Sequence, residues 1–340
     1  MSRKIRVAVV GCGAQAQLAH IPALKVNGSV DLVALCDTDI RKVNQLCLTH
    51  GVPNHYVDFD DLKESGDIDA VVIATPNHLH APMAVAALQY GKDVLCEMPL
   101  ALNARDAAQV VEVAAREKRK LMPCLQARLR PDVQTIKRFI AGNELGKLYY
   151  CKAGQLQGRD SWSLSGWRGQ RLRAGGGAFL TLGTPLLDSA LALLAPARPC
   201  SVIGTAHHRS PKSEVEDTAF AMIRFDEDLM LTVEVGWSML MDKDFTYMNM
   251  VGNSGAALLN PVQIHKEMHG HLVNVTPQLS SKDIERASHR LLVNLWVDAL
   301  VRDVAPAIPA TEALTISRII DAFYQSQSSR CEVPLPAQSS

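Results

Sequence analysis

The sequence predicts an α/β protein with two domains. A doubly wound domain with a parallel sheet is expected at residues 1–124, and an α+β domain with a large, mostly antiparallel sheet at residues 125–340. Three observations support this prediction. The 340 residues exceed the size of one ordinary hydrophobic core. The first part of the chain alternates apolar strands with amphipathic helices, and the second part places extended segments one after another with few helices between them.

In the N-terminal part, continuous apolar runs indicate strands and amphipathic runs indicate helices. Strands are expected at residues 5–10, 30–36, 70–74, 93–96 and 121–124. Helices are expected at residues 18–26, 40–50 and 83–90, and from the N-cap Asn103 to about residue 118. Strands that are apolar throughout are typical of a parallel sheet that is covered on both faces.

The C-terminal part begins with a predicted helix at residues 132–140 and then changes its pattern. Extended segments are expected at residues 147–157, 200–207, 217–225, 230–238 and 245–251. Because these segments are joined mainly by turns, we expect antiparallel pairing. Further helices are expected at residues 179–194, 284–302 and 312–326.

Charge and composition argue against several classes of function. Lys and Arg number 35 and Asp and Glu number 35, so the formal net charge is zero, which disfavours a nucleic-acid partner. We expect no membrane partner, because no apolar run reaches the length that crosses a bilayer. The eight cysteines form no CxxC pair and mostly lie in apolar runs. This favours buried thiols in a reducing cytoplasm over disulfides or a metal site.

A glycine-rich loop follows the first strand. Its sequence, GlyCysGlyAlaGlnAla, fits the pattern G-x-G-x-x-A between a strand and a helix. Gly11 allows a tight turn, Gly13 lets the backbone approach a pyrophosphate, and Ala16 permits close packing of the helix on the strand. Ala14 and Gln15 complete the loop, and the N–H groups that open the helix can bind phosphate. The loop predicts a dinucleotide site in a Rossmann domain.

An acidic residue follows the second strand. The carboxylate of Asp37 is expected to accept hydrogen bonds from the adenosine ribose hydroxyls and to repel a 2′-phosphate. NAD is therefore favoured over NADP as the cofactor. Arg41 lies four residues further on and is included among the expected cofactor-binding residues.

A second loop, Thr75-Pro76-Asn77, follows the strand at residues 70–74, and His80 comes shortly after it. Ligands bind at the carboxyl edge of a doubly wound sheet, so these residues are expected beside the nicotinamide. His78 and His80 alternate, but no carboxylate or cysteine accompanies them at ligand spacing, and metal binding is not expected.

Taken together, these motifs resemble the glucose–fructose oxidoreductase, inositol dehydrogenase and rhizopine-catabolism (Gfo/Idh/MocA) family. The loop at residues 11–16, AlaThrProAsnHisLeuHis and GlyLysAspValLeuCysGluMetPro carry the resemblance, and AlaGlyGlyGlyAla and ValGlyAsnSerGlyAla extend it over nearly the whole chain. The resemblance implies an N-terminal Rossmann domain and a C-terminal domain whose open sheet often forms a dimer face. It also implies a sugar or polyol substrate bound between the domains. We therefore expect a homo-oligomer, either a dimer or a tetramer.

Three positions depart from the family pattern. The resemblance places Met98, which follows Glu97, where the family has a lysine that helps to move the proton of the reacting hydroxyl. It places Thr181 and Pro185 where the family has an aspartate and a histidine. None of the three can act as the general base of alcohol oxidation, which contributes roughly 10²–10⁴ in rate. Glu97 and Met98 are still expected at the cofactor, with Glu97 as a positioning residue.

Other residues must then perform the acid–base and binding steps. Asp188, further along the helix of Thr181, is the best candidate for a relocated base, and the hydroxyl of Thr181 is a candidate for orienting a water or a substrate oxygen. Lys152, His207 and His208 are further candidates. A polyhydroxylated or anionic substrate is expected to be held by hydrogen bonds, stacking and charge from Gln126, Arg128, Trp167 and Arg168. Core packing of the tryptophan and surface ion pairs of the arginines are the structural alternatives.

The sequence leaves three functions open. The first is an NAD(P)-dependent oxidoreductase that acts on a CH–OH group of a sugar or polyol with an altered acid/base centre. The second, implied by some relatives, is a lyase or glycosidase that retains NAD and oxidises its substrate only transiently. The third is a pseudoenzyme that binds a dinucleotide without turnover.

Overall fold

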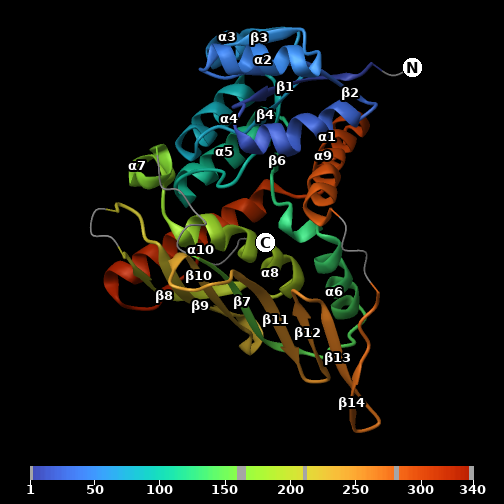
Figure 1. The fold of residues 1–340 in the computed structure, drawn as a ribbon, viewed down its shortest axis with the longest axis vertical. Coiled ribbons are helices and arrows are strands. Elements are labelled where there is room, and N and C mark those ends of the chain that lie inside the picture. Colours follow the sequence, from blue (N-terminus) through green and yellow to red (C-terminus); the bar gives the residue numbers. More distant parts are fainter. Residues whose placement is uncertain (1–2, 159–165, 210–212, 279–282, 337–340) are drawn as a thin grey trace. The chain divides into compact units, whose positions relative to one another are not determined.

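The computed structural model describes residues 3–158, 166–209, 213–278 and 283–336 (Figure 1). The chain divides into two compact units, Met1–Leu125 with Glu285–Ser317 and Gln126–Ile284 with Arg318–Ser340. The first boundary falls next to the expected one at residue 124. Residues 285–317, however, were expected in the second domain and belong to the first unit. One reason is a hydrogen bond of 2.9 Å from the amide of Asn27 to that of Asn294.

The first unit is built on a six-stranded parallel sheet in the order β3-β2-β1-β4-β5-β6. The strands are β1 (Ile5–Val10), β2 (Val30–Cys36), β3 (Asn54–Tyr56), β4 (Ala70–Ile73), β5 (Asp93–Cys96) and β6 (Leu121–Pro123). The core residues of β1 and β4 are fully buried, which is why these strands are apolar without alternation. The predicted doubly wound sheet is confirmed, while the short edge strand β3 was not predicted.

Helices connect these strands, and one helix from the C-terminal part of the chain, α9, also belongs to this unit. They are η1 (Ala16–His20), α1 (Ile21–Val26), α2 (Ile40–His50), α3 (Phe59–Glu64), η2 (Asn77–Leu79), α4 (His80–Gln89), α5 (Ala104–Arg116) and α9 (Ile284–Arg302). The side chain of Asn103 accepts a hydrogen bond from the backbone N–H of Asp106 and caps α5 as predicted. Helix α4 begins three residues before the expected start, because a proline is tolerated in a first helical turn. η1 is a π-helical turn, a rare geometry that is frequent at functional sites.

The second unit is built on a nine-stranded sheet in the order β14-β13-β12-β11-β7-β10-β9-β8-β15. Its strands are β7 (Leu148–Gly158), β8 (Pro199–His207), β9 (Thr218–Phe225), β10 (Met230–Met239), β11 (Phe245–Gly252), β12 (Gly255–Leu259), β13 (Gln263–Met268), β14 (His271–Asn274) and β15 (Val333–Pro334). Every neighbouring pair is antiparallel except β7 and β10, which run parallel. The prediction of a mostly antiparallel sheet is confirmed.

The helical elements of this unit are η3 (Ala127–Leu129), α6 (Pro131–Ala141), η4 (Gly166–Gly169), α7 (Arg171–Ala174), α8 (Ala178–Leu194), η5 (Asp226–Asp228) and α10 (Ala310–Ser329), whose first part lies in the first unit. α8 packs on β7, β9 and β10. The ring of Phe179 on α8 stacks on that of Phe323 on α10, with centroids 3.8 Å apart.

One helical stretch among the described residues is long and apolar enough to cross a membrane, although none was expected. It is Arg171–Leu194, which comprises α7 and α8, and 83% of its most apolar window is buried inside the protein. A central helix of a folded core has the same composition, because it must be apolar on most of its circumference. Burial therefore accounts for the apolar character of α8.

Candidate active site

The glycine-rich loop lies between the end of β1 and the start of η1. Gly11 has a φ of +87°, and a Cβ atom there would lie 2.6 Å from the carbonyl oxygen of Ala74. The loop thus packs directly on the backbone after β4. At Gly13, by contrast, a Cβ atom would meet nothing within 4 Å. The predicted roles of the two glycines are therefore compatible with the structure, because Gly11 makes a close turn and open space lies over Gly13.

The other loop residues differ in exposure. Ala16 is fully buried at the start of η1, as close helix–strand packing requires, and Ala14 is exposed. The amide nitrogen of Gln15 lies 2.8 Å from Nε2 of His289 on α9. Nδ1 of His289 lies 2.9 Å from the carbonyl oxygen of Glu285, which can only accept, so a neutral ring accepts at Nε2 from Gln15. His289 was missed because no local pattern connects α9 with this loop.

Asp37 follows β2 and is an ionised hydrogen-bond acceptor. It accepts from the backbone N–H groups of Cys12, at 2.8 Å, and Asp39, at 2.9 Å. Burial by itself raises the pKa of Asp37, but these two bonds and the ammonium group of Lys42, 3.1 Å away, lower it below its usual range. The cation at this carboxylate is Lys42, whereas Arg41 is exposed and its backbone N–H binds Asp39. Lys42 was not among the predicted residues, and cofactor binding by Arg41 stays a prediction.

The loop after β4 contains Thr75, Pro76 and Asn77, which are all half-buried. The hydroxyl of Thr75 is buried and has no hydrogen-bond partner among the described residues. His80, expected at the cofactor, is 1% exposed, and both of its ring nitrogens lie against backbone carbonyl oxygens. The structure therefore places Thr75 as a group that a ligand can satisfy, and His80 as a residue that holds backbone.

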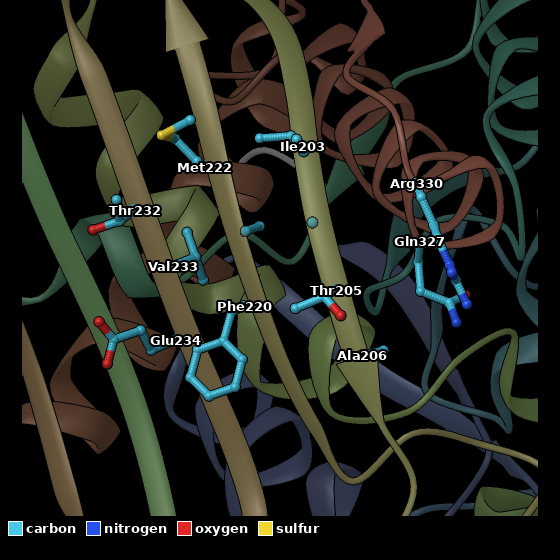
Figure 2. A pocket seen from close by; sticks show the side chains of 12 residues that line it. Ile203, Thr205, Ala206, Phe220, Met222, Thr232, Val233, Glu234, Gln327 and Arg330 are labelled. Atoms are coloured by element: carbon cyan, nitrogen blue, oxygen red, sulfur yellow. The ribbon is translucent and has the colours of Figure 1, made fainter.

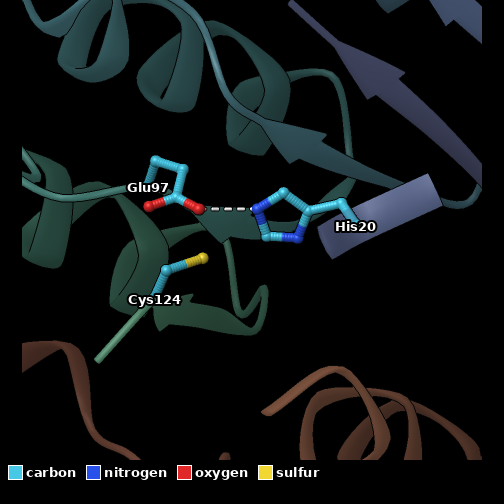
Figure 3. Close-up of side chains that lie close together, drawn as sticks. All are labelled: His20, Glu97 and Cys124. Atoms are coloured by element: carbon cyan, nitrogen blue, oxygen red, sulfur yellow. Dashed lines mark hydrogen bonds and ion pairs between the residues drawn. The ribbon is translucent and has the colours of Figure 1, made fainter. Parts of the chain in front are cut away.

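Three side chains lie close together, of which His20 and Cys124 are buried and Glu97 is half-buried (Figure 3). Nε2 of His20 on η1 lies 2.6 Å from Oε1 of Glu97, and the thiol of Cys124 donates a hydrogen bond to Glu97. Their candidate ligand atoms lie within 4.8 Å of one another, a spacing that could hold a metal ion. Glu97 already bonds both of the other groups, and burial, with the charge of Glu97, raises the pKa of the Cys124 thiol well above its usual range. We interpret the cluster as a hydrogen-bonded support of the Glu97 turn.

Met98 follows Glu97 and is half-buried, and the Met98–Pro99 peptide is cis. The backbone N–H of Met98 lies 3.4 Å from Oε2 of Glu97. The side chain of Glu97 is therefore bound by His20 on η1, and it in turn binds the backbone of Met98, the next residue in the turn. This arrangement fits the expected positioning role of Glu97.

In the second unit, two candidates of the sequence analysis form a buried pair. Nε of Arg128 donates to Oδ1 of Asp188, and the backbone N–H of Arg128 donates to Oδ2 at 3.1 Å. The side chain of Asp188 is 1% exposed. A carboxylate whose two oxygens accept from one arginine is a weaker proton acceptor than an unpaired carboxylate. The structure therefore weakens the expectation that Asp188 is the relocated base.

Thr181 and Pro185 share one side of α8. They are half-buried positions on a helix that is otherwise almost wholly buried, and Asp188 follows Pro185 by three residues on the same side. This side of α8 is the part of the helix from which a side chain can reach a ligand. On this side of the helix, Thr181 contributes a hydroxyl group.

The remaining candidates lie in different places of this unit. Gln126 is half-buried before η3, and the guanidinium of Arg168 lies 4.9 Å from the ring centroid of the half-buried Trp167. Lys152 pairs with Glu234 at 3.0 Å, and its neighbours Cys151 and Ala153 are fully buried. Because side chains alternate along a strand, Lys152 lies on the sheet face opposite the one that α8 covers. His207 and His208 are exposed at and just beyond the end of β8.

A residue that was not singled out holds the start of α8. Glu216 is 1% exposed and accepts hydrogen bonds from the N–H groups of Gly177 and Phe179 and from the hydroxyl of Tyr324, at 2.9–3.1 Å. Burial raises the pKa of Glu216. A carboxylate at the first turn satisfies N–H groups that have no partner within the helix. Glu216 thus fixes the helix that carries Thr181.

The sheet face opposite α8 contains a wide hollow of about 690 Å³ (Figure 2). Side chains of β8, β9 and β10 line it, together with Gln327 and Arg330 at the end of α10 and beyond it. Apolar groups prevail, and Ile203 and Phe220 are 37% and 42% exposed. The polar side chains of Thr205, Thr232, Glu234, Gln327 and Arg330 also line the hollow, which lies apart from the residues of α8.

The first unit has the features that an NAD site requires. The space over Gly13 admits a pyrophosphate, Asp37 is an ionised acceptor for ribose hydroxyls, and the buried hydroxyl of Thr75 lacks a partner among the described residues. With its parallel sheet and this loop, the unit defines an oxidoreductase with an NAD-binding Rossmann domain. The chain matches the family model "Oxidoreductase family, NAD-binding Rossmann fold" at residues 5–124, and the model of the GFO/IDH/MocA C-terminal domain at residues 133–257. It belongs to the Gfo/Idh/MocA oxidoreductase family.

Proteins of known sequence and structure are similar to the chain over nearly its whole length. The chain is 23% identical over 351 residues to D-glucoside 3-dehydrogenase of Escherichia coli, with 98% of each chain covered. Its fold matches levoglucosan dehydrogenase in complex with NADH and L-sorbose with a TM-score of 0.90, 20% identity and coverage of 98% and 100%. It also matches the WlbA dehydrogenase of Bordetella pertussis in complex with NADH and UDP-GlcNAcA, with a TM-score of 0.85, 24% identity and coverage of 99% and 100%.

Proposed function

We propose that this protein oxidises a secondary hydroxyl group of a sugar or polyol with NAD as the hydride acceptor. The observation that carries the proposal is the geometry of the glycine-rich loop in the first unit. Open space lies over Gly13 of this loop, and the backbone N–H of Cys12 in the same loop donates a hydrogen bond to the ionised Asp37. The substrate class is supported by the relatives, whose names specify D-glucosides and levoglucosan. Asp37 favours NAD over NADP because its charge repels a 2′-phosphate.

Alcohol oxidation removes a hydrogen with its electron pair from carbon and a proton from oxygen. When NAD is bound, it supplies the acceptor of the hydride. For the proton, we propose a water molecule that the hydroxyl of Thr181 orients on the half-buried side of α8. Asp188 then acts through Arg128, because its two oxygens accept from that residue and fix the guanidinium for a hydroxyl or phosphate oxygen of the substrate.

The ring of Trp167, with Arg168 against it, would provide a surface for a sugar ring, and Gln126 would provide a hydrogen-bonding amide. The expected roles of Lys152, His207 and His208 are not included. Lys152 lies on the opposite face of the sheet, and the two histidines are exposed at and just beyond the end of a strand.

The test is a turnover assay with NAD over a panel of sugars, sugar phosphates, inositols and glycosides, which follows NADH absorbance and product masses together. Product with matching NADH is the expected result. Product without net NADH would replace the proposal with a lyase or glycosidase that retains NAD. No product with any member of the panel, together with NAD binding, would favour a dinucleotide-binding protein without turnover.

Substitutions test the proposed roles of the named residues. Asp37→Ala should weaken NAD binding, while Asp31→Ala, which alters an exposed carboxylate paired with Lys4, should leave it unchanged. Thr181→Val should lower kcat by roughly 10²-fold if the oriented water is the proton acceptor, and Thr181→Ser should retain activity. Equal rates for the two threonine variants would exclude this role of Thr181.

We also propose that the chain forms a homo-oligomer through the sheet face opposite α8, and that it acts in the cytoplasm. The exposed Ile203 and Phe220 on this face support the first proposal, because a large apolar patch is normally covered in solution. The second rests on the cysteines, which are all free, six of them buried.

A further inference from the structure

Most of the hydrogen-bonding capacity of the Asp37 carboxylate is used within the chain. Oδ1 accepts from the backbone N–H of Asp39 at 2.9 Å and from Nζ of Lys42 at 3.1 Å, and Oδ2 accepts from the backbone N–H of Cys12 at 2.8 Å. A carboxylate offers about four lone-pair sites, two on each oxygen. The described residues therefore fill both sites of Oδ1 and leave one on Oδ2.

This arrangement distinguishes the two nicotinamide dinucleotides. The adenosine ribose of NAD has two free hydroxyl groups, whereas that of NADP has one, because its 2′-oxygen carries a phosphate. Both hydroxyls of NAD can donate to Asp37 only if Lys42 leaves Oδ1. The single hydroxyl of NADP can take the remaining site on Oδ2, and the ammonium group of Lys42 then stays beside the ribose that carries the phosphate.

Lys42 can reach a phosphate from this position. It lies in the first turn of α2, and its side chain is 38% exposed. A lysine side chain carries its charge on a flexible stem, so the ammonium group can turn from the carboxylate to a phosphate, which carries more negative charge at neutral pH. Burial by itself raises the pKa of Asp37, but backbone hydrogen bonds and Lys42 lower it below its usual range, so the ion pair persists at neutral pH.

The other charged groups around this carboxylate come from α2 and α3. Asp39 caps α2, and its side chain accepts from the backbone N–H groups of Arg41 and Lys42. Asp58 and Asp61, at the start of α3, lie near the end of β2, where burial and nearby negative charge, theirs included, raise the pKa of the cysteine thiol. These acidic groups disfavour a phosphate, so its binding at this end of β2 depends on the lysine.

We propose that Lys42 determines the cofactor specificity of this protein: paired with Asp37, it admits NADP beside NAD, because it offsets the charge of the carboxylate and binds the 2′-phosphate. The inference rests on the proposed function, since it concerns the dinucleotide site of the same unit. It limits the preference for NAD that the charge of Asp37 alone would give.

The test is calorimetric titration of the full chain with NAD and with NADP. In the parent, the dissociation constant of NADP should exceed that of NAD by no more than about tenfold, because the ammonium group offsets the carboxylate. Lys42→Met should raise the NADP constant about tenfold or more, the effect of losing one charge-assisted hydrogen bond. It should leave the NAD constant unchanged or lower it, because Oδ1 becomes free for the second hydroxyl. Lys4→Met, which removes another lysine paired with an aspartate of this unit, should leave the ratio unchanged.

A second variant separates the carboxylate from the cation. Asp37→Ala removes the group that competes with phosphate for Lys42, so it should weaken NAD binding and leave NADP binding as tight as in the parent or tighter. Adding Lys42→Met to Asp37→Ala should then weaken NADP binding about tenfold. Each variant is compared with two ligands, so a partly unfolded sample reduces the binding-competent fraction for both and leaves the ratio of the two constants interpretable. The parent measurement needs no variant.

The outcomes separate this inference from the proposed function. NADP binding to the parent more than about tenfold weaker than NAD binding would overturn the inference. So would a ratio of the two constants that Lys42→Met leaves unchanged, or one that Arg41→Met changes more than Lys42→Met does. In each of these cases NAD binding stands. Binding of neither dinucleotide by the parent would overturn the proposed function, and the inference with it.

Discussion

The two glycines of the cofactor loop allow one substitution to be compared at two positions. Gly11 has a φ of +87°, where an L-residue is strained, and a Cβ atom there would lie 2.6–2.7 Å from backbone atoms of Ala74 and Thr75. Backbone atoms cannot move aside as a flexible side chain can. The conformational term costs about 1–2 kcal/mol and the forced displacement about 1–3 kcal/mol. We therefore expect Gly11→Ala to lower the free energy of unfolding by roughly 2–5 kcal/mol.

At Gly13 the same change meets open space and a φ outside the left-handed region. Gly13→Ala should leave the stability of the cofactor-free protein unchanged or raise it by about 0.4–1 kcal/mol, because alanine restricts the unfolded chain. Its methyl group would stand where the pyrophosphate must approach, so NAD affinity should fall about tenfold or more.

Thermal unfolding without cofactor and calorimetric titration with NAD measure the two effects separately. The melting temperature of Gly11→Ala should fall by at least about 4 °C, and that of Gly13→Ala should not fall. Parent-like NAD affinity in Gly13→Ala would refute the assignment of the open space to the cofactor. Parent-like stability in Gly11→Ala would refute the packing argument.

Three further predictions concern other parts of the chain. The lowered pKa of Asp37 means that its interactions stabilise the fold above about pH 4 and are lost as the pH falls through its folded pKa. Asp37→Asn should therefore be less stable than the parent at pH 7, and denaturant titrations should show the difference shrinking in acid. Asp188→Asn removes the charged carboxylate to which buried Arg128 bonds and should lower the free energy of unfolding by roughly 3–5 kcal/mol. Replacing both residues by leucine should restore most of that stability. Additive effects of the two single substitutions in a double-mutant cycle would contradict the pairing. Phe220→Lys on the sheet should convert the proposed homo-oligomer to monomer in light-scattering chromatography, while an unchanged mass would contradict the proposed interface.

Local patterns were sufficient for the α/β class, for most strand and helix positions and for the glycine loop. Strand apolarity reflects burial on both faces, and G-x-G-x-x-A reflects backbone conformation and close approach, so both are visible in a few consecutive residues. Asp37 was found for the same reason, since it directly follows a strand. The cation that pairs with it, Lys42, was not predicted, because the path of the chain at the helix start decides which side chain turns back.

Long-range contacts decided the rest. The pairing of Asp188 with Arg128 joins residues 60 positions apart, and it gives the candidate base a buried cationic partner. His289 reaches Gln15 across 274 positions and brings residues of the C-terminal part into the cofactor unit. The ring of His80 lies between the carbonyl oxygens of Thr75 and Pro99, which only the folded chain brings together. Protonation and pairing depend on which groups burial brings together, and only the tertiary structure specifies those neighbours.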